Sequence, residues 1–557
     1  MAVSCSGQDL LRDPTINKGT AFTLEEREAF DIDGYLPARV SDLGAQLDRT
    51  REAYEVLPTP ISRYQFLRAL QDRNETLFYA FLSLHMEELL PIVYTPTVGE
   101  AIKVFSHIFR TPRGITFSVQ NIHRIAPILE HHPLSDVRMI VATDSSAILG
   151  IGDQGYGGIG ICIGKLTLYT VGGLPPYHAL PVSLDVGTDR EELLADPLYL
   201  GLRAPRLRGA RYLELVDAFV QGVKERFPRA ILQWEDLSKD TAFEVLERYR
   251  KVIPSFNDDV QGTGATALAG LVSAAKLRGV RLTDEVFVVH GAGAGGAGVA
   301  SAIVEGLVKE GLPREAAHRR VLVLDSRGLL TDERPMEDYK RPFAQPRSVV
   351  AAWTTAGPIP SLHETIVQGR ATVLIGLSGQ RGAFDEAAVR AVASNTERPV
   401  IFPLSNPTVN CEALPEDILS WTHGRALVAT GSPFAPVTLA SGEAREVGQG
   451  NNAFVFPGLG GGAVLAEVRE VTDSMVLAAS YALAEYTETR GHLGRGLVYP
   501  PVRELRDVAL HVAARVVAQA VADGVATRQD LPSSLEELEA LCRDVAYVPE
   551  YLPVVKG

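Results

Sequence analysis

The spacing of hydrophobic residues changes character near residue 110. Before that point, apolar positions recur at helical spacing with charged positions between them, which predicts helices over Leu24–Ala29, Ile61–Leu70 and Glu75–Leu90. Pro91 and Pro96 then bracket the segment IVYT. Because proline disrupts helical hydrogen bonding, Tyr94 is predicted to lie in a short non-helical link between two helices.

From Arg138 the pattern becomes one of short apolar runs that are typical of strands, namely VRMIVAT, AILGIG, KLTLYTV, ALPVSLDVG and AILQWED. Two stretches with helical spacing, Tyr212–Phe227 and Ala242–Lys251, lie between or after them. Strands that are apolar on both faces and that alternate with helices are typical of a largely parallel sheet. This part of the chain is therefore predicted to be an α/β domain.

A second α/β unit is predicted after Asn257. A helix-like stretch, Gly264–Leu277, precedes the strand VFVVH, a glycine-rich turn and the helix-like run VASAIVEGLVKE. The strand-like runs VLVLD, ATVLIGLS, PVIFPLSNP and ALVATGS follow, and LPREAAHRR is interpreted as an extra loop before the first of them. Two amphipathic helices, Thr472–Tyr486 and Val502–Ala522, come later, and the last thirty or so residues have the composition of a tail packed on a neighbouring part or a partner.

Length and composition narrow the class of protein. With 557 residues the chain is too long for one core, so roughly two to four domains are expected. The formal net charge of −14 argues against general nucleic-acid binding, and no apolar run approaches the length of a membrane span. The N-terminal segment MAVSCSGQDLLRD has the features of neither a secretory nor a transit peptide. The four cysteines form no CxxC pair, which favours the reducing cytoplasm and argues against a disulfide framework or a thiolate zinc site.

Two segments match the pattern G-x-G-x-x-G: Gly150, Gly152 and Gly155 in the first, and Gly291, Gly293 and Gly296 in the second. A lone match is weak evidence, so the flanking sequence has to decide. The first match contains Asp153, whose charge would repel a diphosphate, and more glycine follows it. The second match follows a strand and opens a helix, whose N-terminus presents free N–H groups and a positive dipole end to phosphates. A dinucleotide site is therefore predicted at the second match.

The next strand, VLVLD, ends in Asp325. A carboxylate there can accept a hydrogen bond from a ribose 2′-hydroxyl and would repel a 2′-phosphate, so Asp325 favours NAD over NADP. Ser326 and Arg327 follow immediately and could accommodate that phosphate, so NADP is not excluded by the sequence.

The glycine-dense stretch Val141–Thr170 contains only three formal charges, Asp144, Asp153 and Lys165. A lysine among apolar and glycine positions is a candidate for a shifted pKa and hence for base chemistry. An isolated lysine of this kind more often extends from a strand edge towards solvent, so its role depends on the rest of the chain.

Two acidic pairs end apolar runs: Glu235 and Asp236 close AILQWED, and Asp258 and Asp259 follow VIPSFN. Adjacent acidic residues are usually only solvated, but α/β folds place ligands at the carboxyl ends of parallel strands. Three carboxylates without His or Cys suit Mg²⁺ or Mn²⁺, which can chelate a 2-hydroxy acid and stabilise an enolate when a carboxyl group leaves. Such chemistry needs a base and an acid, and Lys165 and Tyr94 are suitable residue types, although Tyr94 alone would more often be a packed aromatic.

Seven segments resemble the signature segments of malic enzymes, in the same order: VYTPTVGE (Val93–Glu100), ILGIGDQG…IGKLTLYT, WED, FNDDVQGT, PLSNPT, ATGSPF and GQGNNAFVFPG. The resemblance extends from about Tyr54 to Val516 and is far more specific than one glycine fingerprint. Malic enzymes oxidise and decarboxylate L-malate to pyruvate and CO₂ with NAD(P)⁺ and Mg²⁺ or Mn²⁺, usually as dimers or tetramers. The resemblance therefore implies this reaction, these cofactors, L-malate as the small-molecule substrate and a homodimer or homotetramer, with no nucleic-acid or membrane partner.

The resemblance also implies a role for individual residues. It makes Tyr94 the general acid, Lys165 the general base and Asp258 a neighbour that helps to hold Lys165. The implied metal ligands are Glu235, Asp236 and Asp259. The implied substrate-binding residues are Asn406 and Asn452, with Asn406 also near the nicotinamide.

One position departs from the family pattern. Where the family typically carries an arginine that grips a malate carboxylate, this chain has Ala147. Losing such a charge-assisted contact would be expected to cost on the order of 2–4 kcal/mol in binding. Either another arginine replaces it, for which Arg110 and Arg113 lie in the preceding segment, or the preferred substrate differs, or malate binding is weak.

Two other functions stay open at the level of sequence. The related malolactic enzyme shares these motifs but keeps NAD bound and releases L-lactate. An inactive NAD-binding module is the other alternative, because a fold alone does not guarantee activity.

Four parts are predicted along the chain. They are a helical N-terminal domain at 1–110, a catalytic α/β domain at 111–258 completed by 452–522, a NAD-binding Rossmann domain at 259–451 and a C-terminal tail at 523–557. The predicted fold class is thus α/β with two sheet-containing domains and a helical N-terminal region.

Overall fold

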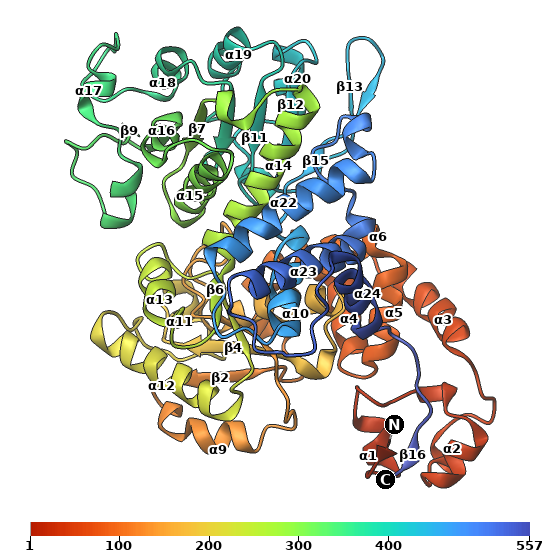
Figure 1. Cartoon of the computed structure of the whole chain (residues 1–557). Helices are drawn as coiled ribbons and strands as arrows, with labels where there is room; N and C mark the ends of the chain where they lie inside the picture. The colour runs from red at the N-terminus through yellow and green to blue at the C-terminus, as the bar shows by residue number, and fades with distance from the viewer. Residues whose placement is uncertain (1) are drawn as a thin grey trace.

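The N-terminal region is helical, as predicted. The computed structural model describes residues 2–557 (Figure 1). This region contains α1 (Gln8–Arg12), α2 (Leu24–Ala29), α3 (Leu43–Glu55), α4 (Pro60–Gln71), α5 (Glu75–Leu84), α6 (Met86–Val93), α7 (Thr97–Lys103) and α8 (Phe105–Ile108). Helix α6 accommodates Pro91 near its end, so the non-helical link that begins at Tyr94 is shorter than predicted. Tyr94 still lies between two helices, and its position at the end of α6 fixes where its ring can point.

The first sheet has five parallel strands in the order β2-β4-β3-β5-β6. Its strands are β2 (Ile115–Ser118), β3 (Met139–Thr143), β4 (Ala179–Asp185), β5 (Ile231–Trp234) and β6 (Ser255–Asn257). Ile140 and Ala142 pack into one hydrophobic core, whereas Met139 and Val141 pack into another. The sheet is therefore buried on both faces, which is why its strands are apolar along their whole length.

Helices cover both faces of this sheet. They are α9 (Ile125–Glu130), α10 (Ile159–Val171), α12 (Ala210–Arg226) and α13 (Ala242–Tyr249), and the short helix α11 (Glu191–Ala195) lies in the connection after β4. Figure 1 shows α9 and α12 together at the outer side of the sheet, and α10 on the side of the C-terminal helices.

Two of the predicted strands are wrong. The run KLTLYTV belongs to α10, and AILGIG forms a loop with a single bridge between Ile148 and Gly152. All residues of α10 are buried, so the helix has no polar face to give the alternation by which a helix is recognised in sequence. Its β-branched and aromatic residues are typical of strands, so the local sequence favours a strand. The segment is a helix in the structure because it packs against β3, β4 and α7.

The second sheet has seven strands in the order β15-β12-β11-β10-β7-β8-β9, all parallel except for the β8–β9 pair. Its strands are β7 (Phe287–His290), β8 (Val321–Asp325), β9 (Gly328–Leu329), β10 (Val373–Gly376), β11 (Val400–Pro403), β12 (Leu427–Thr430) and β15 (Gly448–Gln449). Its helices are α14 (Thr263–Arg278), α15 (Ala294–Lys309), α16 (Arg314–Arg320), α17 (Arg347–Val350), α18 (Leu362–Gly369), α19 (Glu386–Asn395) and α20 (Pro415–Trp421). Most of the segment LPREAAHRR is α16, so its interpretation as a loop is wrong.

The C-terminal part returns to the first sheet. It contains α21 (Phe456–Leu465), α22 (Asp473–Thr489), α23 (Leu505–Ala522) and α24 (Leu535–Val545), and a small hairpin of β13 (Val437–Thr438) and β14 (Ala444–Arg445) precedes it. Helix α21 packs on α23 and on α10, and α24 packs on α23. At the end of the chain β16 (Val555–Lys556) pairs with β1 (Ala2–Val3), so the tail packs on the N-terminal region of its own chain (Figure 1). Over residues 2–557, none of the helices is both long enough and apolar enough to cross a membrane.

Candidate active site

The two predicted acidic pairs lie at the carboxyl ends of adjacent parallel strands. Glu235 and Asp236 directly follow β5, and Asp258 and Asp259 begin η6 (Asp258–Gly262), a single wide turn of π-helix that follows β6. Because β5 and β6 are neighbours in the sheet, their ends bring the two pairs together. One carboxylate oxygen from each of Glu235, Asp236 and Asp259 lies within 4.8 Å of the others.

The backbone of Asp236 is held in an unusual conformation. Its φ is +52°, a value that costs non-glycine residues free energy unless their surroundings impose it. The Asp236 N–H donates to Asp259 Oδ2 at 2.7 Å, and the Ala147 N–H donates to the Asp236 carbonyl oxygen at 3.0 Å. The two contacts fix the peptide groups on either side of Asp236 and so aim its carboxylate.

This carboxylate cluster fits a divalent cation. Burial and mutual repulsion raise the pKa values of Glu235 and Asp236 well above their ordinary values, and burial raises that of Asp259 to about 6. Within the part of the chain that the structure describes, the buried Asp236 Oδ2 has no hydrogen-bond partner. An all-oxygen donor set with an unpaired buried oxygen suits a hard ion such as Mg²⁺ or Mn²⁺.

Lys165 extends from the buried helix α10 into this cluster. Its ammonium group donates to Asp258 and lies 3.0 Å from Glu235 Oε1 and 4.4 Å from the centre of the Phe456 ring. Burial alone would lower the pKa of Lys165, but Asp258 and Glu235 raise it well above its ordinary value. Without a bound ion or substrate, Lys165 is therefore charged. Its burial by itself would favour the neutral form.

Tyr94 packs beside Lys165. Its side chain is only 4% exposed, and the Lys165 ammonium lies 5.6 Å from the centre of its ring. A Cβ atom on Gly164 would lie 3.4 Å from Tyr94 Cδ2, so the glycine leaves room for the ring next to the lysine. Burial raises the pKa of Tyr94, which keeps its phenol protonated.

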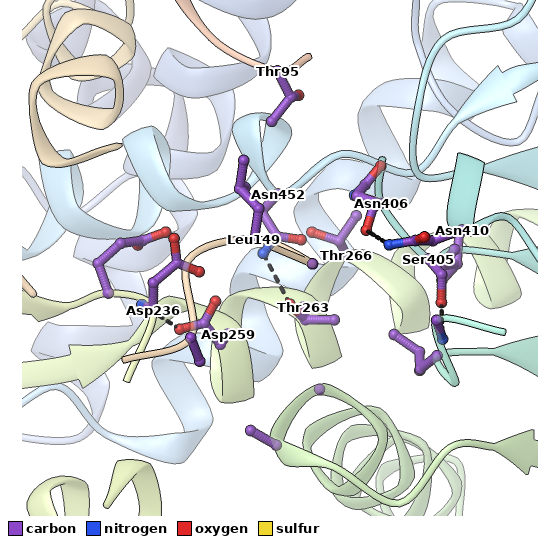
Figure 2. A pocket seen from close by; sticks show the side chains of 18 of the residues that line it. Thr95, Leu149, Asp236, Asp259, Thr263, Thr266, Ser405, Asn406, Asn410 and Asn452 are labelled. Atoms are coloured by element: carbon purple, nitrogen blue, oxygen red, sulfur yellow. Dashed lines mark hydrogen bonds between the residues drawn. The ribbon is translucent and has the colours of Figure 1, made fainter. Parts of the chain in front are cut away.

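These groups line one cavity of about 710 Å³. In Figure 2, Asp236 and Asp259 lie at one side of the cavity, Asn406 and Asn410 lie at the other, and Asn452 lies between them. The first sheet thus contributes one wall, and the turn after β11 contributes the other.

The two predicted asparagines are held in different ways. Asn452 Nδ2 donates to Asp258 Oδ2 at 3.0 Å. It also donates to Thr263 Oγ1 at 2.9 Å (Figure 2), which leaves its carbonyl oxygen to accept. The Ser432 hydroxyl donates to Asn406 Oδ1 at 2.6 Å, which leaves Asn406 Nδ2 to donate. One acceptor and one donor are thereby oriented in the same cavity.

Ala147 lines the cavity, but neither Arg110 nor Arg113 does. Arg113 is paired with Glu75 and lies 3.4 Å from Asp72, in the N-terminal region. The interpretation that one of these two arginines replaces the missing family arginine is therefore not supported. Over residues 2–557, the basic residues that line this cavity are Lys165 and Lys239.

The second glycine match forms the turn between β7 and α15. Gly291 has φ +118°, and a Cβ atom there would come within 2.4 Å of the Leu377 backbone. A Cβ atom on Gly293 would have no other atom within 4 Å, so a ligand can approach the backbone of this glycine closely. A Cβ atom on Gly296 would collide with the Gly291 carbonyl oxygen, so that glycine allows the helix to pack on the strand. The N-terminus of α15 reaches the cavity through Ala294 and Gly295.

Asp325 ends β8, as predicted, but it is not a free carboxylate. Arg334 Nη2 lies 2.8 Å from both of its oxygens, the Arg327 N–H donates to it at 2.9 Å, and Lys340 Nζ lies 3.7 Å away. Burial would raise the pKa of Asp325, but these contacts keep it below its ordinary value. Sequence reasoning missed Arg334 and Lys340, since no spacing rule connects them to the strand end.

The first glycine match is a packing feature. Asp153 accepts from Arg206 Nη1, Thr188 Oγ1 and the Asp189 N–H, each at 2.9 Å. A Cβ atom on Gly150 would lie 2.3 Å from the Asn406 carbonyl oxygen, so this loop packs closely against the opposite wall of the cavity. The first match therefore packs one wall of the cavity against the other, and the second match is the one that forms a turn from a strand into a helix.

Two family models match this chain. The model described as "Malic enzyme, N-terminal domain" matches residues 71–250, and the one described as "Malic enzyme, NAD binding domain" matches residues 260–521. A protein from Sodalis glossinidius named NAD-dependent malic enzyme is 44% identical over 548 residues, which cover 98% of this chain and 96% of the relative. A Pseudomonas aeruginosa protein of the same name is 45% identical over 527 residues, which cover 94% of this chain and 93% of the relative.

Solved structures agree with these matches. The malic enzyme from Entamoeba histolytica has a TM-score of 0.57 and 25% identity, and the match covers 91% of this chain and 92% of that one. The malic enzyme from Pyrococcus horikoshii has a TM-score of 0.55 and 24% identity over 82% of this chain and 88% of that one, and this likeness supports the fold alone.

Proposed function

This chain belongs to the malic enzyme family, and we propose that its cavity catalyses the oxidative decarboxylation of L-malate to pyruvate and CO₂ with reduction of NAD. The observation that supports this proposal best is the convergence of Tyr94, Lys165 and the carboxylate cluster with the glycine-rich turn in one cavity. Malolactic activity and an inactive NAD-binding module are not favoured, since the relatives above are named NAD-dependent malic enzymes.

Glu235, Asp236 and Asp259 are the proposed ligands of a Mg²⁺ or Mn²⁺ ion. When bound, the ion would chelate the hydroxyl and carboxylate of the substrate, withdraw charge during decarboxylation and offset the carboxylate charge around Lys165. The strained and anchored backbone of Asp236 supports the proposal, because it holds one ligand in place before any ion arrives.

Lys165 Nζ is the proposed base for the C2 hydroxyl proton. Lys165 lies in the cavity, and its Nζ donates a hydrogen bond to Asp258. Once the ammonium group has lost one proton, this hydrogen bond orients the lone pair of the neutral amine. Asp258 is itself held by Asn452, so the asparagine also helps to position the base.

Tyr94 is the proposed acid for C3 after CO₂ has left. Its raised pKa keeps the phenolic proton available at neutral pH, and its ring lies next to Lys165. The two residues therefore face the same substrate from neighbouring positions, one to accept a proton and one to donate it.

Asn406 and Asn452 are proposed to bind the substrate, and Asn406 also the nicotinamide side of the coenzyme. Their oriented amide groups can pair with a carboxylate and a hydroxyl without supplying charge. Because Ala147 provides no guanidinium, we expect L-malate to bind less tightly here than it would with an arginine at that position.

NAD is the proposed coenzyme rather than NADP. Gly291, Gly293 and Gly296 are proposed to hold its diphosphate at α15, and Asp325 its adenosine ribose. Asp325 is ionised but paired with Arg334 and close to Lys340, so the preference for NAD is supported mainly by the relatives named NAD-dependent malic enzyme.

Several coarser properties are part of the same proposal. We place domain boundaries at residues 110, 258 and 451, with 452–522 completing the first sheet domain and 523–557 as a tail. We also propose a cytoplasmic location, in line with four free cysteines, and a homodimer or homotetramer that binds neither nucleic acid nor membrane. Light scattering coupled to gel filtration would measure the oligomeric state directly.

One assay tests the proposed reaction. The full-length protein is mixed with L-malate, Mn²⁺ and either NAD⁺ or NADP⁺, and the absorbance of the reduced coenzyme is followed while pyruvate and lactate are quantified. We expect NADH and pyruvate in equal amounts, with NAD⁺ used in preference. Lactate without net NADH would indicate the malolactic reaction, and no turnover with intact NAD binding would indicate an inactive module.

A further inference from the structure

Lys239 is the accessible cation of the cavity. It lies between β5 and α13 and lines the cavity together with Ala294 and Gly295, the first residues of α15. Its side chain is 53% exposed, whereas the other lysine that lines the cavity, Lys165, is buried and paired with carboxylates. Its ammonium group is therefore available to a ligand.

Charged contacts direct Lys239 towards the coenzyme side of the cavity. Its Nζ lies 3.8 Å from Glu337 Oε1, and Glu337 Oε2 lies 2.8 Å from Lys340 Nζ. Lys340 Nζ in turn lies 3.7 Å from Asp325 Oδ2. An alternating chain of charges thus connects Lys239 to the carboxylate proposed to bind the adenosine ribose.

Aromatic packing holds the segment that contains Glu337, Tyr339 and Lys340 against the glycine-rich turn. The Phe243 ring, in the first turn of α13, stacks on Tyr339 with 4.9 Å between ring centres and 11° between planes. The Tyr339 hydroxyl donates to the Ala292 carbonyl oxygen at 3.1 Å. Ala292 lies within the glycine-rich turn and Phe243 follows Lys239 by four positions, so the segment that carries Lys239 packs close to the place where a diphosphate would bind.

The glycine-rich turn itself lacks a cation. The segment Gly291–Gly298 contains no lysine or arginine, so α15 offers only N–H groups and its dipole to a diphosphate. Asp240, a carboxylate that lines the cavity and is not among the proposed metal ligands, would repel a diphosphate. A positive charge supplied from across the cavity would offset this repulsion.

We propose that Lys239 binds the diphosphate of the coenzyme, opposite the N-terminus of α15. The inference rests on the proposed NAD-dependent function and adds to it a coenzyme-binding residue from the sheet that carries the carboxylates. The ion pair with Glu337 is long and half-exposed, and such exposed pairs contribute little to stability, so exchanging Glu337 for phosphate costs little.

The test compares Lys239→Ala and Lys239→Arg with the control Lys251→Ala, which alters an exposed lysine of the same sheet unit that does not line the cavity. Binding of ADP-ribose and of adenosine is measured by isothermal titration calorimetry, and steady-state kinetics give the KM for NAD⁺ and for L-malate. We expect Lys239→Ala to weaken ADP-ribose about tenfold, which corresponds to about 1.4 kcal/mol, and to raise the KM for NAD⁺ similarly. Adenosine binding, the KM for malate and the melting temperature should not change, and Lys239→Arg should restore most of the affinity.

Three outcomes would overturn the inference. The first is unchanged ADP-ribose binding in Lys239→Ala, and the second is an equal loss for ADP-ribose and adenosine. The third is a raised KM for malate with ADP-ribose unaffected, which would assign Lys239 to the substrate carboxylate instead. If the wild-type protein binds ADP-ribose through Lys239 but does not oxidise malate, the proposed function fails while this inference stands.

Discussion

Replacing Lys165 with methionine separates its structural role from its chemical one. The lysine balances the buried carboxylates Asp258 and Glu235, and removing one partner of a buried, hydrogen-bonded pair costs about 3–5 kcal/mol. For a unit of about 150–250 residues, that loss lowers the melting temperature by on the order of 6–20 °C. Methionine retains most of the apolar stem, so the effect reports the lost charge more than a lost contact.

A second substitution tests whether charge is the cause. Asp258→Asn in the Lys165→Met background removes the stranded carboxylate, and we expect most of the lost stability to return. Activity should not return, because the proposed base is still missing, and general-base catalysis contributes roughly 10²–10⁴-fold. Asp258→Asn alone should also lower activity, since it no longer orients the lysine.

Scanning calorimetry without added divalent ions measures the stability, and coenzyme reduction measures the activity. Lys103→Met is the matched control, because its ion pair with Glu100 is exposed and such pairs contribute about 0.2–1 kcal/mol. The reasoning would be refuted if Lys165→Met melted like this control, or if the double variant were no more stable than Lys165→Met. Recovery of turnover in the double variant would refute the role of Lys165 as the base.

Three further predictions concern other parts of the molecule. Ala147→Arg should lower the KM for malate by about thirtyfold, equivalent to about 2 kcal/mol, and an unchanged or raised KM would contradict this expectation. Mn²⁺ at about 100 times its Kd should stabilise the wild-type protein by about 2.7 kcal/mol in calorimetry, and Asp236→Asn should abolish this gain; an equal gain in the variant would place the ion elsewhere. Burial, with a contribution from the nearby Arg515, lowers the pKa of His511 to about 4, so the folded protein binds fewer protons there than the unfolded chain. Stability from this group is full above about pH 6.5 and is lost as the pH falls towards 4, so the melting temperature of His511→Leu should fall less over that range than that of the wild type; parallel curves would contradict this.

Local sequence predicted those features that depend on neighbours in the chain. Strand β7, its glycine-rich turn and α15 follow one another directly, so a pattern of apolar residues, glycines and apolar residues sufficed to predict them. The acidic pairs could be predicted to lie near a ligand because they end strands, and parallel strands present those ends at one edge. Three helical stretches of the N-terminal region were predicted from apolar residues at helical spacing, although the structure divides Glu75–Leu90 between α5 and α6.

Where the local sequence pattern is ambiguous, tertiary packing determined the secondary structure and the contacts. Helix α10 is buried on all sides, so its sequence lacks the alternation that would distinguish it from a strand. Helix α16 is short and largely charged, so its sequence gave little indication of a helix. The neighbours of Asp325 also escaped prediction, since Arg334 and Lys340 reach it from a loop with no regular spacing.

The sequence by itself predicted the kinds of residue in the candidate site, and the two α/β units whose strand ends present the carboxylates and the glycine-rich turn. Only the tertiary structure decided which of these residues meet: Lys165 and Asp258 are 93 positions apart, and neither Arg110 nor Arg113 reaches the cavity. The physical reason is that periodicity specifies which face of an element is buried but not which element covers it. Partners are selected by the packing of the whole chain, because distant segments are brought together only when the contacts they make outweigh the loss of chain entropy.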